Sequence, residues 1–138
     1  MDNQSLELRA IKPEESPSLV LAYIGDAVYE LAVREYLVQR GMVKVNQLHR
    51  TAVKYVRAGA QAKALFFLED KLSEEEMAVV RRGRNAKSGT PPKGACVLEY
   101  RHATALEALI GYLYIKERHE RVREIIGMAV DEISRQLS

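Results

Sequence analysis

The sequence is poor in cysteine. Cys96 is the single cysteine among 138 residues, so no disulfide can form within the chain. Disulfides belong to oxidising compartments and are rare in reducing ones. The first residues, MDNQSLELRA, also lack the basic segment and apolar stretch that mark a secretory signal. Together these absences predict a cytoplasmic protein.

Long hydrophobic runs are absent as well. No stretch approaches the roughly 18 consecutive apolar residues that indicate a membrane-spanning helix, so we expect no membrane partner. Apolar residues still make up 47% of the 138 residues, and this length is typical of one domain. We therefore predict a single domain over residues 1–138, with a core that needs no disulfide or metal to hold it.

The patterns of zinc sites and of nucleophilic catalysis are also missing. His49, His102 and His119 do not have the spacing of metal ligands. No Ser-His-Asp or Cys-His pattern is supported by the sequence. We therefore expect no zinc centre.

Acidic residues are missing from one segment. The whole chain has 21 basic and 19 acidic residues, and this balance alone does not indicate a nucleic-acid partner. Between Met77 and Leu98, however, there is no acid. Local positive charge attracts polyanions even where the total charge is small. The other interpretation is a solvated surface, where basic residues are common.

The remaining pattern is helical, and no segment predicts a strand. After an N-terminal extension over residues 1–16, apolar residues recur at helical spacing, and Gly41 is expected to end the first helix as its C′ residue. Ser73 and Glu76 form a capping box, S-x-x-E. The expected helices cover about 17–40, 47–68 with a bend at Gly59, 74–82 with a stop at Gly83, 99–116 and 119–137. The predicted fold class is all-α.

Two groups of residues are candidates for phosphate contacts. The stretch GRNAKSGTPPKG forms most of a predicted basic loop over residues 83–97, and loops this long in compact domains are often functional. The first group lies in and just before this loop, and consists of Arg81, Arg82, Arg84, Asn85, Lys87 and Lys93. The second group follows helical spacing, and consists of His49, Arg50, Lys54 and Arg57.

Two carboxylates stand in mostly apolar helical surroundings. Asp26 lies in AYIGDAVYEL and Glu107 in TALEALIGYLY, and two facing helices would bring them together. Mg²⁺ prefers hard oxygen ligands and usually takes one or two carboxylates from a protein. The alternative is structural, because buried acids are usually paired. Glu30 lies on the Asp26 face and is assigned a supporting role. Room for a neighbouring helix or a bulky ligand is expected at the small residues Ala22, Gly25 and Gly111.

These motifs resemble a known family. LAYIGDAVYE resembles the signature helix of the ribonuclease III family, and EALIGYLY resembles that family's second acidic helix. Their order and separation also match, and the resemblance covers nearly the whole chain from about Leu19. A classical member continues into a double-stranded-RNA-binding domain at the point where this chain ends. Together with YRHATALEALIGYLY and RRGRNAKS, this difference resembles the Mini-ribonuclease III subfamily.

The resemblance implies a homodimer with the ribonuclease III endonuclease fold. Such an enzyme cuts double-stranded RNA with Mg²⁺ and leaves 5′-phosphate ends. The family's catalytic, metal-binding acids fall on Asp26 and Glu107, whereas two further acids fall on Ala22 and Thr104. The full set for two metals is therefore not present, and Thr104 is assigned a supporting role in orienting a metal-bound water. Residues expected at the dimer interface are Tyr23, Ala27 and Leu31.

The resemblance also implies a substrate. The two basic groups would bind RNA, and the subfamily is associated with maturation of the 23S ribosomal RNA precursor. The sequence leaves open whether a ribosomal protein assists. One rival hypothesis is a non-catalytic RNA-binding or ribosome-assembly scaffold on the same fold, which the absence of acids at Ala22 and Thr104 favours. Another is a helical protein-interaction module that does not bind RNA.

Overall fold

The computed structural model describes residues 11–86, 93–94 and 96–138. These residues form helices and no strand, which confirms the all-α fold class. The α-helices are α1 (Ser18–Gln39), α2 (Val45–Val56), α3 (Ala58–Leu68), α4 (Glu74–Asn85), α5 (Val97–Ile115) and α6 (His119–Leu137). Two short 3-10 turns, η3 (Pro13–Glu15) and η4 (Glu69–Lys71), precede α1 and follow α3.

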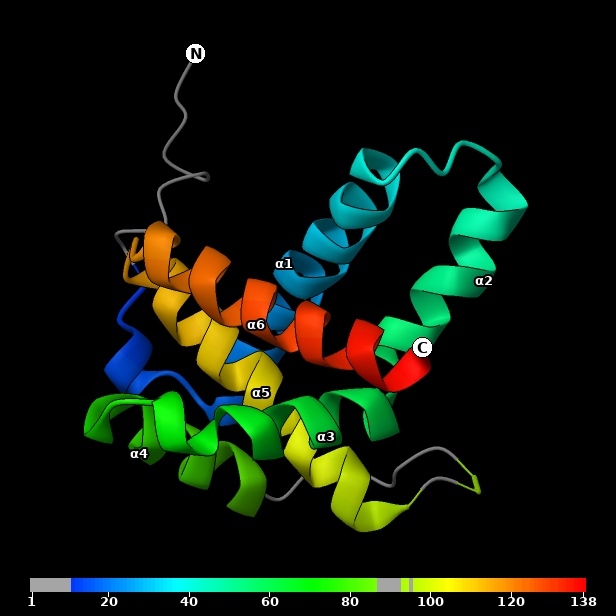
Figure 1. Cartoon of the computed structure of the whole chain (residues 1–138). Helices are drawn as coiled ribbons and strands as arrows, with labels where there is room; N and C mark the ends of the chain where they lie inside the picture. Colours follow the sequence, from blue (N-terminus) through cyan, green and yellow to red (C-terminus); the bar gives the residue numbers. More distant parts are fainter. Residues whose placement is uncertain (1–10, 87–92, 95) are drawn as a thin grey trace.

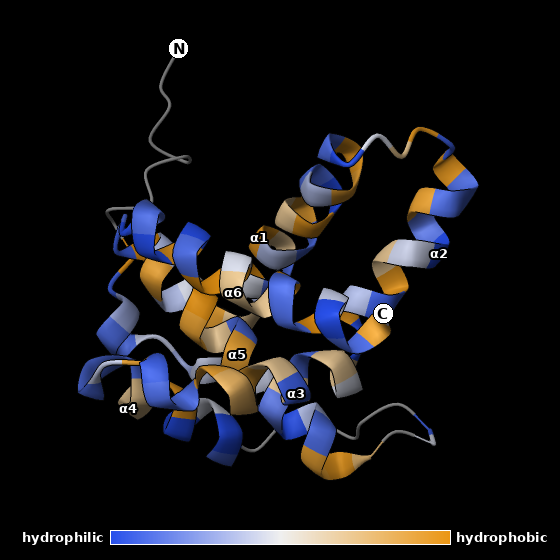
Figure 2. Ribbon diagram, in the orientation of Figure 1, coloured by the Kyte–Doolittle hydropathy of each residue, from blue (hydrophilic) through white to orange (hydrophobic). Residues whose placement is uncertain are grey.

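Helix α5 is the centre of the fold. Its sequence is apolar on every side, which is the pattern of a helix surrounded by others. Twelve of its residues are buried, and it packs against α1, α3, α4 and α6. Figure 1 shows α6 crossing in front of α5, with α3 and α4 below it. In Figure 2 hydrophobic residues gather along α5, whereas α4 presents hydrophilic turns to the outside.

Helix α1 ends as predicted at a glycine. Gly41 has a φ of 90°, a left-handed conformation that favours glycine. The N–H of Gly41 donates to the carbonyl of Val38 at 3.0 Å, and the N–H of Met42 donates to the carbonyl of Leu37 at 3.3 Å. These bonds satisfy carbonyls at the helix end. The chain then turns into α2, which packs against α1 (Figure 1).

The break between α2 and α3 differs from the prediction. The expected bend at Gly59 is wrong, because the helix is interrupted at Arg57, whose φ of −63° and ψ of 152° are extended. Gly59 belongs to α3. An extended residue cannot continue the helical hydrogen bonds, so the carbonyls at the end of α2 need other partners.

The start of α4 was predicted correctly and its end was not. The Ser73 hydroxyl accepts from the Glu76 N–H at 3.1 Å, and the Glu76 carboxylate accepts from the Ser73 N–H at 2.9 Å, which confirms the capping box. The predicted stop at Gly83 is wrong, since α4 continues to Asn85. A Cβ on Gly83 would lie 2.9 Å from the Cα of Ala105, so this glycine serves close packing against α5.

This longer α4 changes the boundaries of the basic loop. Residues 83–85 are helical and Val97 begins α5, so the connection is residues 86–96 rather than 83–97. Four residues of the first basic group therefore stand on α4: Arg81, Arg82, Arg84 and Asn85. Lys87 lies outside the described residues.

The described end of the N-terminal extension is packed on the domain. Pro13 is buried, and the Glu14 carboxylate lies 2.6 Å from the Lys116 ammonium at the end of α5. The first ten residues of the predicted extension lie outside the described residues. No helix in the described part of the chain combines the length and the apolar character needed to cross a membrane.

Candidate active site

The site begins at the crossing of α1 and α5. A Cβ on Gly25 would lie 1.7 Å from the carbonyl oxygen of Glu107, and a Cβ on Gly111 would lie 1.9 Å from that of Leu21. Only residues without a Cβ allow the two backbones to approach so closely. The expectation of a close helix at Gly25 is confirmed. The expected room for a bulky ligand beside Gly111 and Ala22 is wrong, because α1 fills the space and Ala22 is itself buried.

This crossing brings the two predicted acids together. Asp26 follows Gly25 directly, and Gly25 touches the backbone of Glu107. Burial raises the pKa of Glu107 from its ordinary value of 4.5 to about 7, a hydrogen bond from Gln61 opposes the rise, and the neighbouring Asp26 adds to it through its charge and a hydrogen bond. The two carboxyl groups are therefore adjacent and repel each other when both are ionised.

Asp26 itself is not buried within the chain. The sequence predicted a carboxylate inside a packed apolar helix, but its side chain is exposed. The buried residues of α1 include Gly25 and Tyr29, and Asp26 is not among them. Its apolar neighbours Tyr23 and Ala27 are exposed as well. Part of the apolar run AYIGDAVYEL therefore lies on the exposed surface of the chain.

A residue that the sequence interpretation missed holds Glu107. Gln61 on α3 is only 1% exposed. Its side-chain N–H₂ donates to Glu107 Oε2 at 3.1 Å and to the carbonyl of Val56 at 2.8 Å. A signal was present in AQAKALFFL, where Gln61 and Lys63 are the two polar residues in a run of small and apolar ones.

The two residues with predicted supporting roles are engaged elsewhere. The Thr104 hydroxyl is buried and donates to the carbonyl of Tyr100 at 3.0 Å, within its own helix. The Glu30 carboxylate lies 3.7 Å from the guanidinium of Arg34. Among the described residues no three His, Cys, Asp or Glu side chains gather into a possible metal site. Their support for the acid pair stays a prediction.

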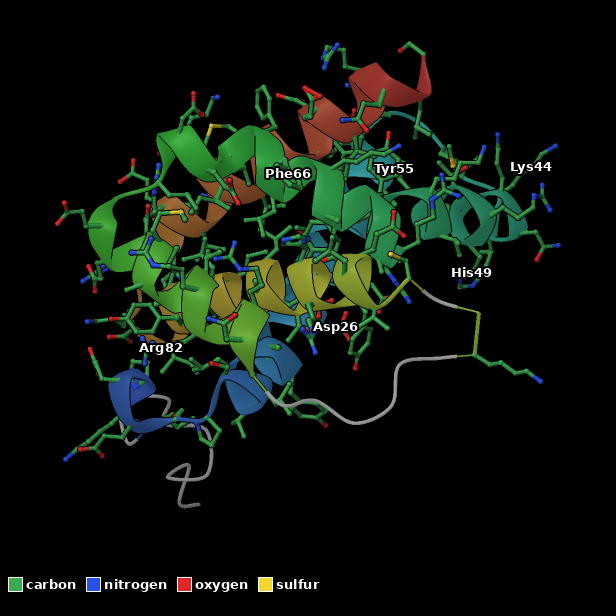
Figure 3. The ribbon with its side chains drawn as sticks, turned by 90° about the horizontal axis from the view of Figure 1, so that it is seen from below. Asp26, Lys44, His49, Tyr55, Phe66 and Arg82 are labelled. Atoms are coloured by element: carbon green, nitrogen blue, oxygen red, sulfur yellow. The ribbon has the colours of Figure 1, made fainter. Side chains whose placement is uncertain are left out.

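Most of the predicted basic residues are exposed. Arg81, Arg82 and Asn85 are exposed on α4, and Arg84 is half-buried. Lys93 is exposed, and so are all four members of the second group: His49, Arg50, Lys54 and Arg57. In the part of the chain that the structure describes, no salt bridge involves either group. Figure 3 shows Asp26 between Arg82 of α4 and His49 of α2.

Comparison with known proteins decides the family. The model of the ribonuclease III domain matches residues 19–118, which includes both acids and the helices that carry them. The chain belongs to the ribonuclease III family. Two curated relatives named Mini-ribonuclease 3 are similar to it over most of their length. The protein from Brevibacillus brevis is 54% identical and covers 85% of this chain and 87% of its own. That from Symbiobacterium thermophilum is 51% identical and covers 93% and 98%.

A solved structure supports the same fold. The crystal structure of a Fusobacterium nucleatum protein superposes with a TM-score of 0.77 at 33% identity, and covers 86% of this chain and 94% of that one. The resemblance to the Mini-ribonuclease III subfamily is thus confirmed, and the chain is an endoribonuclease. The family match and the names of the relatives support a double-stranded-RNA endoribonuclease, and enzymes of this family are generally metal-dependent.

Proposed function

We propose that the chain is a homodimeric, Mg²⁺-dependent endonuclease that cuts double-stranded RNA and matures the precursor of 23S ribosomal RNA. The observation that carries the proposal is the Asp26–Glu107 pair at the glycine crossing of α1 and α5. Contact between two carboxylates is unfavourable when both are charged. A divalent cation would remove that repulsion.

The donor set fits Mg²⁺. This ion usually takes one or two carboxylates from a protein and completes its shell with water and substrate phosphate. Asp26 is exposed and open to a phosphate, and Glu107 is held from the protein side by Gln61. These two residues would hold the ion. When bound, it lowers the pKa of a water and neutralises charge on the scissile phosphate.

The basic groups suit a duplex. Double-stranded RNA is recognised mainly through its phosphates, its 2′-hydroxyls and its A-form shape. Arg81 and Arg82 stand on α4, which packs against α5, the helix that carries Glu107. The second group adds exposed basic residues along α2 and at its C-terminal end. We infer that both groups contact the RNA backbone on either side of the acids, and the 23S precursor is inferred from the likeness to the Mini-ribonuclease 3 relatives.

An exposed apolar face on α1 supports the dimer. Tyr23 is 79% exposed and Leu31 is 60% exposed. With Ala27 they recur every four residues, so they lie on one face of α1. Large apolar patches are rare on the surfaces of monomers. A second copy of the chain would cover this face, and Tyr23 would place the interface one helical turn from Asp26.

A cleavage assay tests the catalytic assignment. Wild type and Asp26→Asn are incubated with folded precursor ribosomal RNA and with a plain RNA duplex, with and without Mg²⁺. We expect Mg²⁺-dependent cleavage by the wild type and none by the variant, which should remain folded. Asp70→Asn removes an exposed carboxylate that pairs with Lys71 and serves as the matched control. Normal cleavage by Asp26→Asn would show that the acid pair is not the catalytic centre.

Salt dependence tests the RNA surface. We expect Arg81→Gln, Arg82→Gln and Arg84→Gln together to weaken duplex binding and to reduce the slope of log K against log salt by about one for each lost phosphate contact. Arg123→Gln, an exposed residue of α6, is the control. An unchanged slope in the triple variant would mean that these residues form only a solvated surface.

The molar mass of the protein in solution tests the proposed dimer. Tyr23→Asp combined with Leu31→Asp is expected to give a folded monomer in light scattering, because charge would have to be buried in the interface. Val43→Asp changes another exposed apolar residue, 81% exposed, and is expected to leave the dimer intact. A dimeric double variant would exclude the α1 face as the interface.

A further inference from the structure

Gln61 is an unusual residue for the core of this domain. It is 1% exposed, and its neighbours Ala60, Ala62 and Leu65 are buried apolar residues. Burying an amide costs free energy unless it is hydrogen-bonded. Its side chain uses both hydrogens of Nε2, one on Glu107 and one on Val56. The side-chain oxygen Oε1, also buried, has no hydrogen-bond partner among the described residues.

These contacts determine which way the amide points. A carboxylate and a backbone carbonyl are both acceptors, so only the N–H₂ side can face them. The oxygen is left without a partner as a result. The side chain therefore satisfies its two acceptors at the expense of its own oxygen, which would not be expected if Gln61 only filled space.

The two groups that accept hydrogen bonds from Gln61 belong to different helices. Val56 is the last residue of α2, where the extended Arg57 interrupts the helix and leaves carbonyls without helical partners. Glu107 is one of the two acids of the proposed site. Gln61, which lies on α3, thus links the Glu107 carboxylate of α5 to the backbone at the end of α2. This bond engages Oε2 of Glu107 at 3.1 Å.

We propose that Gln61 is a positioning residue that holds the Glu107 carboxylate in the orientation required to bind the metal ion beside Asp26. This inference rests on the proposed function, because it assumes that the two acids hold a metal. Residues that hydrogen-bond to metal ligands orient them, and their loss typically weakens metal binding by 10-fold to 100-fold. Gln61 itself need not touch the ion or the RNA.

Direct metal binding tests the inference without RNA. Gln61→Met retains the length of the side chain and removes both donors. Mn²⁺ is added to the full-length protein, and the free ion is measured by electron paramagnetic resonance. We expect the variant to bind Mn²⁺ at least 10-fold more weakly than wild type. In cleavage assays its Mg²⁺ requirement should rise by a similar factor, with the KM for RNA unchanged and kcat restored by excess Mg²⁺.

Two controls separate positioning from general stability. Ile125→Val removes one methylene group from the core of α6, lowers stability and should leave Mn²⁺ affinity unchanged. Gln61→Leu repeats the loss of donors with another side chain, so the test does not depend on the folding of one variant. Mn²⁺ affinity within twofold of wild type in either folded Gln61 variant would overturn the inference.

A third variant separates this inference from the proposed function. Asp26→Asn should abolish Mn²⁺ binding if the acid pair holds the metal. If Asp26→Asn loses Mn²⁺ and the Gln61 variants retain it, only the positioning role is excluded. If Asp26→Asn binds Mn²⁺ as wild type does, the metal site itself is misplaced and both proposals fail.

Discussion

Replacing Glu107 with Gln is expected to stabilise the metal-free protein while it abolishes cleavage. The ionised carboxylate is partly buried and adjoins Asp26, and both features disfavour its charge. A glutamine at this position is neutral and similar in shape. Its side-chain oxygen can still accept the hydrogen bond that Gln61 donates at 3.1 Å.

The size of the expected stabilisation follows from the shift in the pKa of Glu107. A rise from 4.5 to about 7 corresponds to roughly 3 kcal/mol of unfavourable free energy for the folded, ionised state. Relaxation of the exposed Asp26 side chain reduces this, so a gain of about 1–3 kcal/mol is expected at pH 8. For a domain of this size that is a rise in Tm of about 3–10 °C.

The pH dependence has a definite sign. The pKa of Glu107 is higher in the folded protein than in the unfolded chain, so its charge destabilises the fold above about pH 7. The penalty disappears as the pH falls toward 4.5, where the carboxyl group is protonated in both states. The Tm advantage of Glu107→Gln should therefore be large at pH 8 and small at pH 5.

Thermal unfolding in a chelator at both pH values measures this difference. Asp70→Asn, which neutralises an exposed acid, should show no comparable gain at pH 8. Added Mg²⁺ should stabilise wild type and not Glu107→Gln. If Glu107→Gln were less stable than wild type at pH 8, the charge of Glu107 would not destabilise the fold as inferred. The same conclusion would follow if its Tm advantage were equal at pH 8 and pH 5.

Two further predictions concern packing and charge. Gly25→Ala should lower the free energy of unfolding by about 3 kcal/mol in denaturant titrations, at the upper end of the range of about 1–3 kcal/mol for overpacking, because its Cβ would meet the Glu107 carbonyl oxygen at 1.7 Å. Gly127→Ala on α6, where a Cβ meets nothing within 4 Å, should raise it by up to about 1 kcal/mol; equal losses would contradict the predicted clash. Arg121→Met should cost about 3 kcal/mol at pH 7, the lower end of the range for a buried ion pair that loses one partner, because it leaves the buried Glu76 without its guanidinium. Since Arg121 lowers the pKa of Glu76, this cost should shrink below about pH 4, and a constant cost in titrations at pH 7 and pH 3 would contradict the role of the ion pair.

Local signals in the sequence predicted local structure well. The capping box at Ser73 and the C′ glycine at Gly41 were both found where the pattern placed them. Each depends on hydrogen bonds between residues a few positions apart, so the sequence contains all the participants. The last helix, expected over residues 119–137, spans His119–Leu137. Its strongly one-sided apolar pattern identifies a helix that packs by one face.

The glycines inside helices show a feature that local sequence signals do not predict. Gly59 and Gly83 were interpreted as helix breakers, yet both lie within helices. Gly83 is required because α4 packs closely on α5 at Ala105. A glycine inside a helix weakens it, but its effect on packing depends on which helix comes near. That neighbour is distant in sequence and leaves no local pattern.

The sequence by itself determined the class of the fold, the two acids and the family, because helical periodicity and the motifs around Asp26 and Glu107 are contained in short segments. The tertiary structure decided what those acids experience. The contact of Gly25 with Glu107 brings α1 against α5, leaves Asp26 exposed and Glu107 partly buried, and brings Gln61 from α3 to the Glu107 carboxylate. Burial, charge repulsion and this hydrogen bond act through space between three helices, so no single segment of the sequence specifies them.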